Sequence, residues 1–271
     1  MSAAPPWSQS AARLAWRDGE GRPGAREIPE ETPIALAYDA STYAVMMASP
    51  ANLEDFAVGF SLTEGIIDHP SELRGMEMVE QPLGIEARLW LAPERSARLA
   101  ERRRLMAGPT GCGLCGIDSL EQAVRRWPAV GGEDLRITPD EVRAAMAALT
   151  AAQPLGAATR AAHAAGFWRD GVLVAAREDV GRHNALDKLI GALARAGENG
   201  TDGAVLLTSR VSIEMVQKTA RLGAPILIAV SAPTWLAVQT ARETGITLIA
   251  VARQDGFEVF SHPERVGPRS R

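Results

Sequence analysis

The chain has 271 residues, of which 46% are hydrophobic and 23% are charged, and its mean hydropathy is −0.06. This balance is typical of a globular protein and excludes disorder over most of the length. The formal net charge of −4 argues against a protein that holds nucleic acid or an anionic membrane through bulk positive charge. A chain of this size can fold without metals or disulfides, as one large domain or as two modest ones.

The apolar stretches do not predict a membrane segment. The best apolar run, 225–238, is interrupted by polar residues and proline, and it is shorter than the roughly 18 residues that a spanning helix needs. Residues 1–26 contain proline, serine and charges but no apolar signal-peptide core, so we expect a disordered leader. The expected location is the cytoplasm, with no membrane partner.

Residues 27–107 predict a small N-terminal α+β lobe. Two apolar strands flank a polar turn at 39–42, which is typical of a hairpin. Asn52 is the expected N-cap of a helix, and Gly65 the residue that ends it. A further strand is expected at 85–92, and the Arg/Glu-rich stretch 93–104 is expected to be an exposed helix or connector.

Residues 118–271 predict an α/β domain. A helix is expected from Asp118, and Thr138 with Glu141 forms a capping box for the next one. From His163 the pattern becomes strand, turn at 170–171, strand, and then helices and strands in alternation to residue 262. Continuous apolar strands between capped helices indicate a sheet covered on both faces by right-handed crossovers.

Four predicted strands end in polar, small or glycine-bearing segments. Ligands of open α/β sheets lie beyond the carboxyl ends of strands, where helix N-termini offer free N–H groups. Any single segment fits ordinary cap chemistry, but four of the same character favour a site for a phosphate or nucleotide. No Walker loop and no G-x-G-x-x-G motif is present. The segments are 177–184, 208–210, 231–234 and 253–256.

Cys112 and Cys115 are the only cysteines, and they stand in a Cys-Gly-Leu-Cys-Gly segment that predicts a mobile loop over 108–117. A structural zinc site would need four ligands, and the four histidines are scattered. A dithiol oxidoreductase usually has its CxxC pair directly after a strand, which this pattern lacks. The third interpretation is a mobile nucleophilic arm that carries a group to a partner.

His183 stands at a predicted helix N-terminus, where the positive end of the helix dipole favours the neutral imidazole. The segment 181–188 around it is unusually rich in polar and charged residues, and it includes Lys188. Lys188 and Lys218 are the only lysines among 29 basic residues. The segment therefore suits either a ligand site or a solvated helix surface.

Taken together, these segments resemble the formate dehydrogenase accessory sulfurtransferase family, whose members are sulfur carriers. The resemblance runs from about Glu27 to Val266 and includes motifs of the first lobe as well. The segments that carry it are 30–33, 49–53, 59–60, 63–65, 112–116, 178–188, 208–218 and 231–237.

The resemblance implies a cytidine-deaminase-like α/β domain without the deaminase zinc, together with the smaller N-terminal lobe and a homodimer. It implies that Cys112 holds a persulfide and that Cys115 assists. The substrate cofactor would be a molybdenum bis(molybdopterin guanine dinucleotide), with a cysteine desulfurase and formate dehydrogenase as partners. The guanine-nucleotide moiety of this cofactor would contact two kinds of position, the segment after the penultimate strand and three helix starts. These residues are Val251, Ala252, Arg253, Gln254, Asp255, Gly256, His183, Ser209 and Ser231.

The sequence thus predicts a sulfurtransferase that takes persulfide sulfur from a desulfurase and transfers it to the molybdenum cofactor. We expect no tightly bound metal in the protein itself. The alternative is a non-catalytic chaperone that binds and protects the cofactor. Sulfur loading of the cysteines separates the two functions.

Overall fold

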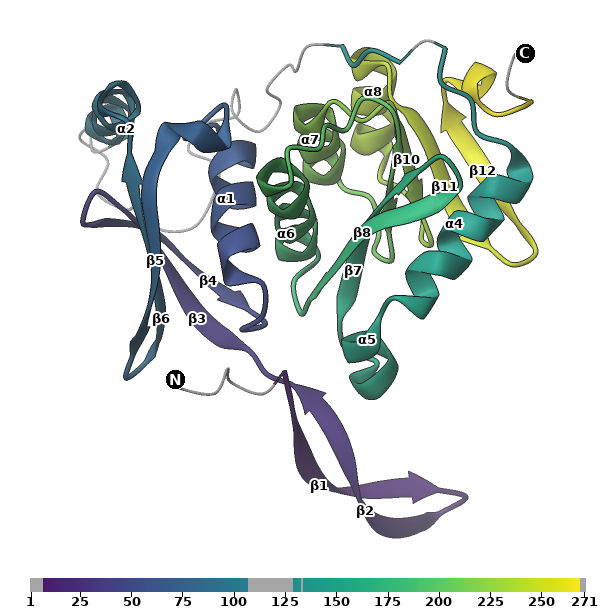
Figure 1. Cartoon of the computed structure of the whole chain (residues 1–271). Helices are drawn as coiled ribbons and strands as arrows, with labels where there is room; N and C mark the ends of the chain where they lie inside the picture. The colour runs from purple at the N-terminus through teal and green to yellow at the C-terminus, as the bar shows by residue number, and fades with distance from the viewer. Residues whose placement is uncertain (1–6, 107–128, 133, 269–271) are drawn as a thin grey trace.

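The computed structural model describes residues 7–106, 129–132 and 134–268. Cys112, Cys115, the predicted loop 108–117 and the helix expected from Asp118 lie outside these residues. The described chain forms two lobes, each built on its own sheet, and a separate two-stranded hairpin (Figure 1). The α/β class with a smaller α+β lobe is confirmed.

The first lobe is built on a four-stranded sheet in the order β4-β3-β6-β5. The predicted hairpin is confirmed, because its turn residues Asp39 and Ala40 have φ of 49° and 62°, as a tight turn between twisted strands requires. The strand expected at 85–92 is also present, whereas its antiparallel partner β5 was not predicted. The strands are β3 (Thr32–Tyr38), β4 (Ser41–Ala48), β5 (Leu73–Gln81) and β6 (Gly84–Leu91).

Helix α1 (Leu53–Thr63) packs on this sheet, and α2 (Pro93–Met106) lies beside its upper end (Figure 1). Asn52 is the residue just before the helix, as predicted, but the capping interaction expected of it is absent: it has a left-handed φ of 54°, and its side chain makes no capping hydrogen bond. An N-cap residue needs extended backbone geometry to bring its side chain over the first turn. Gly65 does have the expected positive φ, 69°, just after the helix. A short 3-10 helix, η1 (Pro70–Glu72), precedes β5.

The second lobe contains a six-stranded mixed sheet in the order β12-β11-β10-β9-β7-β8. Strands β9, β10 and β11 are mutually parallel, whereas β7 and β12 are antiparallel to their neighbours. Each strand predicted from His163 onward is confirmed. Their bounds are β7 (His163–Arg169), β8 (Val172–Asp179), β9 (Ala204–Leu207), β10 (Ile226–Ala229), β11 (Thr247–Arg253) and β12 (Gly256–Ser261).

Helices α6 (Arg182–Arg195), α7 (Ile213–Leu222) and α8 (Trp235–Thr244) share one face of this sheet. Helix α4 (Pro139–Ala151) covers the other face, and its predicted capping box at Thr138 is confirmed. The expectation of crossovers on both faces is therefore wrong, although both faces are covered. Strand order advances from β9 to β11 without reversal, so successive right-handed crossovers stay on one side. The shorter α5 (Pro154–Thr159) and η2 (Pro263–Arg265) complete the lobe.

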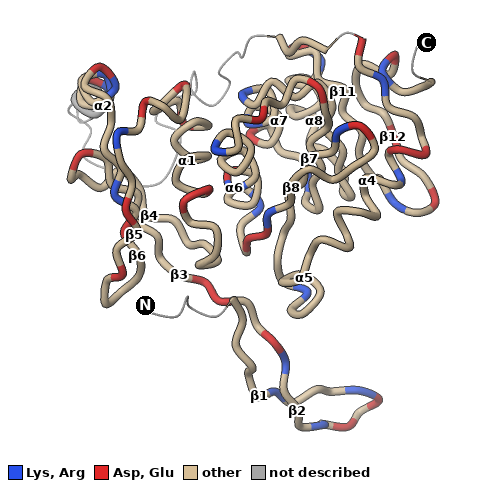
Figure 2. The backbone as a smooth tube through the Cα atoms, in the orientation of Figure 1, with Lys and Arg blue, Asp and Glu red and all other residues tan. Residues whose placement is uncertain are grey.

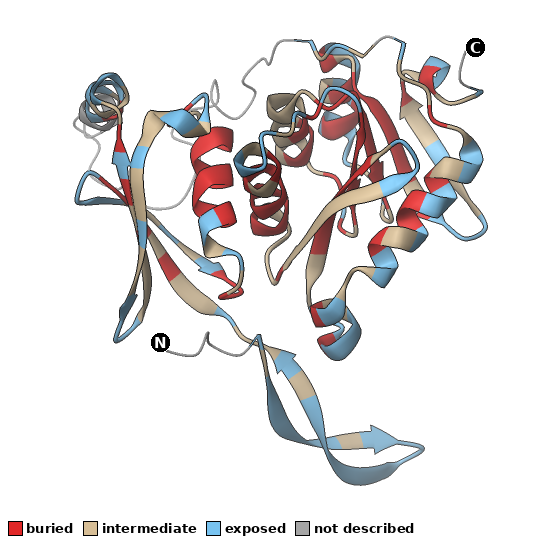
Figure 3. Ribbon diagram, viewed as in Figure 1, coloured by how far each residue is buried: buried red, intermediate tan, exposed pale blue. Residues whose placement is uncertain are grey.

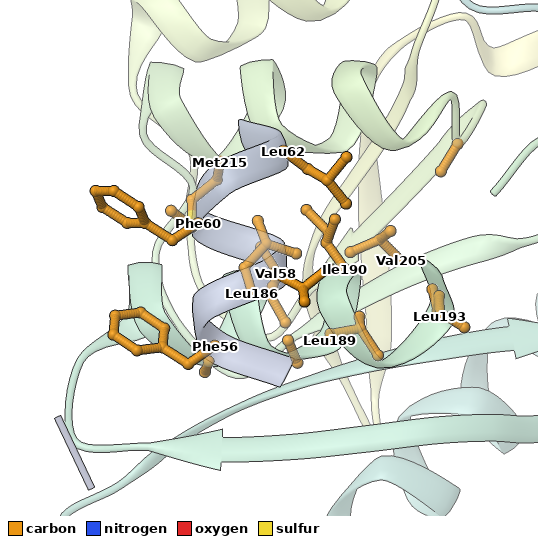
Figure 4. Close-up of a cluster of buried hydrophobic side chains, with 14 of the residues drawn as sticks. Phe56, Val58, Phe60, Leu62, Leu186, Leu189, Ile190, Leu193, Val205 and Met215 are labelled. Atoms are coloured by element: carbon orange, nitrogen blue, oxygen red, sulfur yellow. The ribbon is translucent and has the colours of Figure 1, made fainter. Parts of the chain in front are cut away.

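The two lobes share a core, because α1 and α6 pack side by side between the two sheets (Figure 1). Apolar side chains of α1, among them Phe56 and Leu62, lie with Leu186 and Leu189 of α6 in one buried cluster (Figure 4). Both helices are among the most buried elements of the molecule (Figure 3). The lobes therefore form one continuous hydrophobic unit rather than two loosely linked domains.

The prediction of a disordered leader over 1–26 is wrong from residue 8 onward, since β1 (Ser8–Arg17) and β2 (Glu20–Pro29) pair along their whole length. The turn residues Asp18 and Gly19 have φ of 53° and 80°. Asp-Gly favours this two-residue turn, so the signal was present in the sequence. The hairpin projects from the lobes and is largely exposed (Figures 1 and 3).

Candidate functional site

The carboxyl ends of four strands meet at one edge of the six-stranded sheet, as predicted. His163, at the start of β7, pairs with Asp179 at the end of β8, and Ala165 pairs with Leu207 at the end of β9. Leu207 in turn pairs with Ala229, the last residue of β10. His183, Ser209 and Ser231 follow the ends of β8, β9 and β10, and the range 251–256 contains the end of β11 and its turn. We call this edge the strand-end site.

Asp179 is the centre of a buried polar network at this edge. Its Oδ1 accepts hydrogen bonds from the Gly181 amide at 2.7 Å and from Asn184 Nδ2 at 3.0 Å. Its Oδ2 lies 2.6 Å from Lys188 Nζ and accepts from the Ser49 amide at 3.0 Å. Each carboxylate oxygen thus has two hydrogen-bonding or ionic partners, although the group is removed from water.

Lys188 is wholly buried, and its side chain also donates to the Ser49 carbonyl at 2.8 Å. Burial lowers the pKa of Lys188 from 10.5, and the neighbouring Asp179 carboxylate opposes that shift. Lys188 belongs to the segment 181–188, for which the sequence left a ligand site and a solvated helix surface open. The solvated surface does not hold for Lys188, because this side chain is buried and bonds to Asp179 and to the Ser49 carbonyl of the first lobe.

His183 and Glu214 form a second polar pair, closer to solvent. His183 Nε2 lies 3.4 Å from Glu214 Oε2, and Ser212 Oγ donates to the same oxygen at 2.8 Å. The contact with His183 is the largest cause that lowers the pKa of Glu214 from 4.5 to about 2, although His183 Nε2 has no partner of hydrogen-bond geometry among the described residues. The sequence did not point to Glu214, although its place in the first turn of α7 is favourable for an acidic residue.

His163 and Arg182 add two nitrogen-bearing side chains beside this pair. Burial and then the Arg182 charge lower the pKa of His163 from 6.5, while Asp179 opposes the change. The Nε atom of Arg182 is buried and has no hydrogen-bond partner among the described residues. Donors that lack a protein partner are the groups an anionic ligand would use.

Ser209 and Ser231 are placed differently from the expectation. Ser209 is buried, and its hydroxyl donates to the Arg210 carbonyl at 3.0 Å. Neither serine directly precedes a helix, because a parallel bridge between Val211 and Pro233 extends both strand ends first. Helix α7 starts at Ile213 and α8 at Trp235. The free N–H groups expected at these helix starts therefore lie further along the chain.

Residues 251–256 form the end of β11 and its turn into β12. Val251 has a φ of 52°, a left-handed backbone that is rare for a β-branched residue. The β11–β12 register shifts between Ala250 and Arg253, so a β-bulge coincides with this residue. Ala252 is buried, whereas Arg253, Gln254 and Asp255 are exposed.

A further buried ion pair joins α6 and α7 away from the strand-end site, and a hydroxyl of α1 connects it to the first lobe. Lys218 Nζ lies 2.6 Å from both Asp187 carboxylate oxygens, and Thr63 Oγ1 donates to Asp187 Oδ1 at 2.8 Å. Both lysines of the chain thus form ion pairs with aspartates, Lys188 with Asp179 of β8 and Lys218 with Asp187 of α6. The compact ammonium of lysine is not interchangeable with a guanidinium at such positions, because the two groups differ in shape and hydration.

No group of three or more His, Cys, Asp or Glu side chains that could hold a metal ion occurs within 7–106, 129–132 and 134–268. The expectation that the protein has no metal of its own stays a prediction, since the cysteines lie outside these ranges. Acidic and basic residues are interspersed over both lobes (Figure 2). Across the described part of the chain, no helix combines the length and apolarity that a bilayer crossing requires.

The fold and the strand-end site define a two-lobed mixed α/β protein with polar strand ends gathered at one sheet edge, the arrangement of a ligand-binding α/β protein. A family model described as the FdhD/NarQ family matches residues 29–267, and the chain belongs to that family.

Curated relatives match nearly the whole chain. A sulfur carrier protein FdhD of Agrobacterium fabrum is 53% identical over 257 residues, which cover 94% of each chain. The protein of the same name from Cupriavidus necator is 49% identical and covers 97% of this chain and 92% of its own. A crystal structure described as a formate dehydrogenase accessory protein from Desulfotalea psychrophila is 27% identical, with a TM-score of 0.75 over 97% of this chain and 100% of that one.

Proposed function

We propose that this chain is a sulfurtransferase that accepts sulfane sulfur from a cysteine desulfurase on Cys112 and passes it to the molybdenum cofactor of a formate dehydrogenase. The observation that carries the proposal is the combination of family and chemistry. Relatives about 50% identical are named sulfur carriers, and this chain has only two cysteines, in one CxxC segment. Free thiols persist in the cytoplasm, which is the compartment we propose.

Loading needs no redox partner. The Cys112 thiolate attacks the outer sulfur of the desulfurase persulfide, the sulfur–sulfur bond of the donor breaks, and the donor cysteine leaves as a thiolate. A new sulfur–sulfur bond forms on Cys112. The exchange consumes one persulfide and one thiolate and produces one persulfide and one thiolate, so the numbers of electrons and protons are unchanged.

Discharge requires two electrons, because sulfane sulfur leaves as sulfide. In this proposal the Cys115 thiolate attacks Cys112 Sγ, the outer sulfur departs as hydrosulfide to the cofactor, and a disulfide forms between Cys112 and Cys115. Two thiols are oxidised while one sulfur is reduced. A cellular dithiol reductant then restores both thiols, which gives Cys115 its assisting role.

The cofactor, as substrate, would sit at the strand-end site through the diphosphate and guanine of its nucleotide half. Arg182 and His183 offer nitrogen donors for phosphate, and the turn at 254–255 offers backbone groups for the guanine edge. The gathering of polar strand ends supports this placement. From the family resemblance we expect the protein to be a homodimer, and we expect formate dehydrogenase to be its partner.

The test is mass spectrometry of the intact protein after incubation with a cysteine desulfurase and cysteine. We expect an added mass of about 32 Da, one sulfur atom, on the native protein and on Cys115→Ala. Cys112→Ala should carry none. Loading of Cys112→Ala to the native level would refute a persulfide on Cys112.

The second candidate is a cofactor-binding chaperone without a covalent step. The strand-end site favours it, because its polar groups are complete without the cysteines. If the protein is a chaperone, its Cys112→Ala variant should bind guanosine diphosphate and support formate dehydrogenase maturation as well as the native protein does. A sulfurtransferase would bind the nucleotide in that variant yet fail to mature the enzyme, so the two readouts together separate the candidates.

A further inference from the structure

One buried carboxylate connects the first lobe to the turn that begins the strand-end site. Gly181, whose amide donates to Asp179, is the residue just before α6, and Arg182 and His183 follow it directly. The Val180 amide in the same turn donates to Ser49 Oγ at 3.2 Å. Each peptide N–H of this turn therefore has an acceptor whose position depends on Asp179 or on Ser49.

We propose that Asp179, held by Lys188 and Ser49, is the positioning residue of the strand-end site: it fixes the turn at 180–181 and so sets where Arg182 and His183 face an anionic substrate. The inference rests on the proposed function only for the identity of that substrate, the diphosphate of a nucleotide. Asp179 itself does not touch the ligand.

The first lobe takes part in this positioning. Ser49, just after β4, bonds to the network with three groups: its amide donates to Asp179, its hydroxyl accepts from Val180, and its carbonyl accepts from Lys188. Asn184 Nδ2 also donates to the Met47 carbonyl at 2.8 Å. A site in the second lobe is thus shaped by backbone groups about 130 residues earlier in the chain.

Stability alone does not account for this arrangement. A buried ion pair is weak evidence for stability, since the cost of removing both charges from water offsets their attraction. The pair of Asp187 on α6 and Lys218 on α7 is similarly enclosed, with side chains 1% and 13% exposed. It bonds to the Thr63 side chain and to no amide of the site turn. Only the Asp179 pair reaches the groups that would contact ligand.

This contrast supplies a matched control. In Asp179→Asn one carboxylate oxygen becomes an NH₂ group, which cannot accept from the Gly181 amide or from Lys188. Asp187→Asn makes the same chemical change in the other pair. We expect Asp179→Asn to weaken binding of guanosine diphosphate by at least about tenfold, as loss of a charge-assisted hydrogen bond does, measured by calorimetry. Asp187→Asn should bind within about twofold of the native protein.

A second readout does not need ligand. Amide hydrogen exchange at 180–183 should quicken in Asp179→Asn, because the side chain loses either the Gly181 N–H or the Lys188 contact that holds it in place, and should stay native in Asp187→Asn. If Asp179→Asn fails to fold, Ser49→Ala removes only the acceptor of the Val180 amide and should quicken exchange at the same turn. Its control is Ser61→Ala, which removes a buried hydroxyl of α1 that bonds Tyr38 and the Ala57 carbonyl.

Equal nucleotide affinity and equal exchange at 180–183 in Asp179→Asn and Asp187→Asn would overturn the positioning role. Native exchange at the turn in Ser49→Ala would also count against it. If the native protein binds no guanosine diphosphate, the nucleotide half of the proposed function fails. In that case, the comparison of hydrogen exchange at 180–183 between Asp179→Asn and Asp187→Asn alone tests whether Asp179 holds the turn.

Discussion

Gly59 of α1 and Gly191 of α6 face each other where the two helices cross, and neither position has room for a β-carbon. A Cβ on Gly59 would lie 1.7 Å from the Asp187 carbonyl oxygen, and one on Gly191 would lie 1.8 Å from the Asp55 carbonyl oxygen. The helix backbones are therefore in direct contact. This close approach brings Asp187 within reach of Thr63 and joins the two lobes.

Gly59→Ala should lower the free energy of unfolding by about 3 kcal/mol, because a backbone clash of this depth requires the helices to separate. Gly24→Ala is the control, since a Cβ there meets no atom within 4 Å, and it should change stability by less than about 0.5 kcal/mol. Urea denaturation of both variants measures the difference. Equal stability of the two variants would contradict the close crossing.

Glu214→Gln tests the pair of His183 and Glu214. The folded-state pKa of Glu214 is about 2, below its ordinary value of 4.5, so the carboxylate stabilises the fold above pH 4.5. As the pH falls from 4.5 towards 2, the unfolded chain takes up the proton first and this contribution is lost. The side chain is 37% exposed, and solvent screening reduces the effect to about 1 kcal/mol at neutral pH.

The measurement is the free energy of unfolding of native and Glu214→Gln protein at several pH values. The native protein should be the more stable above pH 4.5, and the two should converge as the pH approaches 2. A difference that stays constant across this range would show that the carboxylate charge has no role.

A chain that begins at Glu27 tests how far the β1–β2 hairpin contributes to the fold. The hairpin is held to the second lobe by Arg26, which donates to the Thr159 carbonyl at 3.0 Å, and its residues are mostly exposed. An isolated two-stranded sheet has little stability of its own. Truncation should therefore lower the free energy of unfolding by less than about 1 kcal/mol, by urea denaturation. A loss of several kcal/mol would show that the lobes depend on the hairpin.

The second lobe was predictable because its signals are local. The capping box at Thr138 and the alternation of apolar strands with helices each act within a few residues. The hairpin at 8–29 was missed because its strands carry few large apolar residues, and only Asp18-Gly19 marked the turn. The capping hydrogen bond of Asn52 was predicted wrongly because asparagine favours both the N-cap position and the left-handed conformation that it has here.

The candidate site was predictable at the level of topology but not of side chains. Parallel strands bring their carboxyl ends to one edge, so the gathering of His183, Ser231 and 251–256 followed from the strand pattern. The roles of Asp179 and Lys188 depend on Ser49, which is 130 residues from Asp179 in sequence. No local pattern contains that contact, so the sequence left a ligand site and a solvated surface open and did not predict burial.

Elemental analysis tests the predicted lack of a structural zinc. Two thiolates supply only half of a closed tetrahedral set. The described residues offer no cluster of three His, Cys, Asp or Glu side chains to complete it. Purified protein should hold well below about 0.2 zinc per chain, because an incomplete set binds weakly. A value near one zinc per chain would refute the prediction and assign the cysteines to a metal.

Val251→Gly tests whether the backbone at the end of β11 is strained. A left-handed conformation costs a β-branched residue roughly 1–2 kcal/mol, and glycine removes that cost. Glycine also loses side-chain contacts and gains freedom in the unfolded chain, which costs about 0.5–1 kcal/mol. These effects offset each other, so the free energy of unfolding should change by less than about 1 kcal/mol.

Val259→Gly is the matched control, because Val259 lies on the paired strand β12, packs against the second core cluster and has no positive φ. It should lose about 2 kcal/mol, through lost burial and the same backbone freedom. An equal loss in both variants would show that Val251 is unstrained. If the strain serves to hold the bulge toward a ligand, Val251→Gly should in addition bind guanosine diphosphate more weakly than Val259→Gly, because a flexible bulge must be ordered on binding.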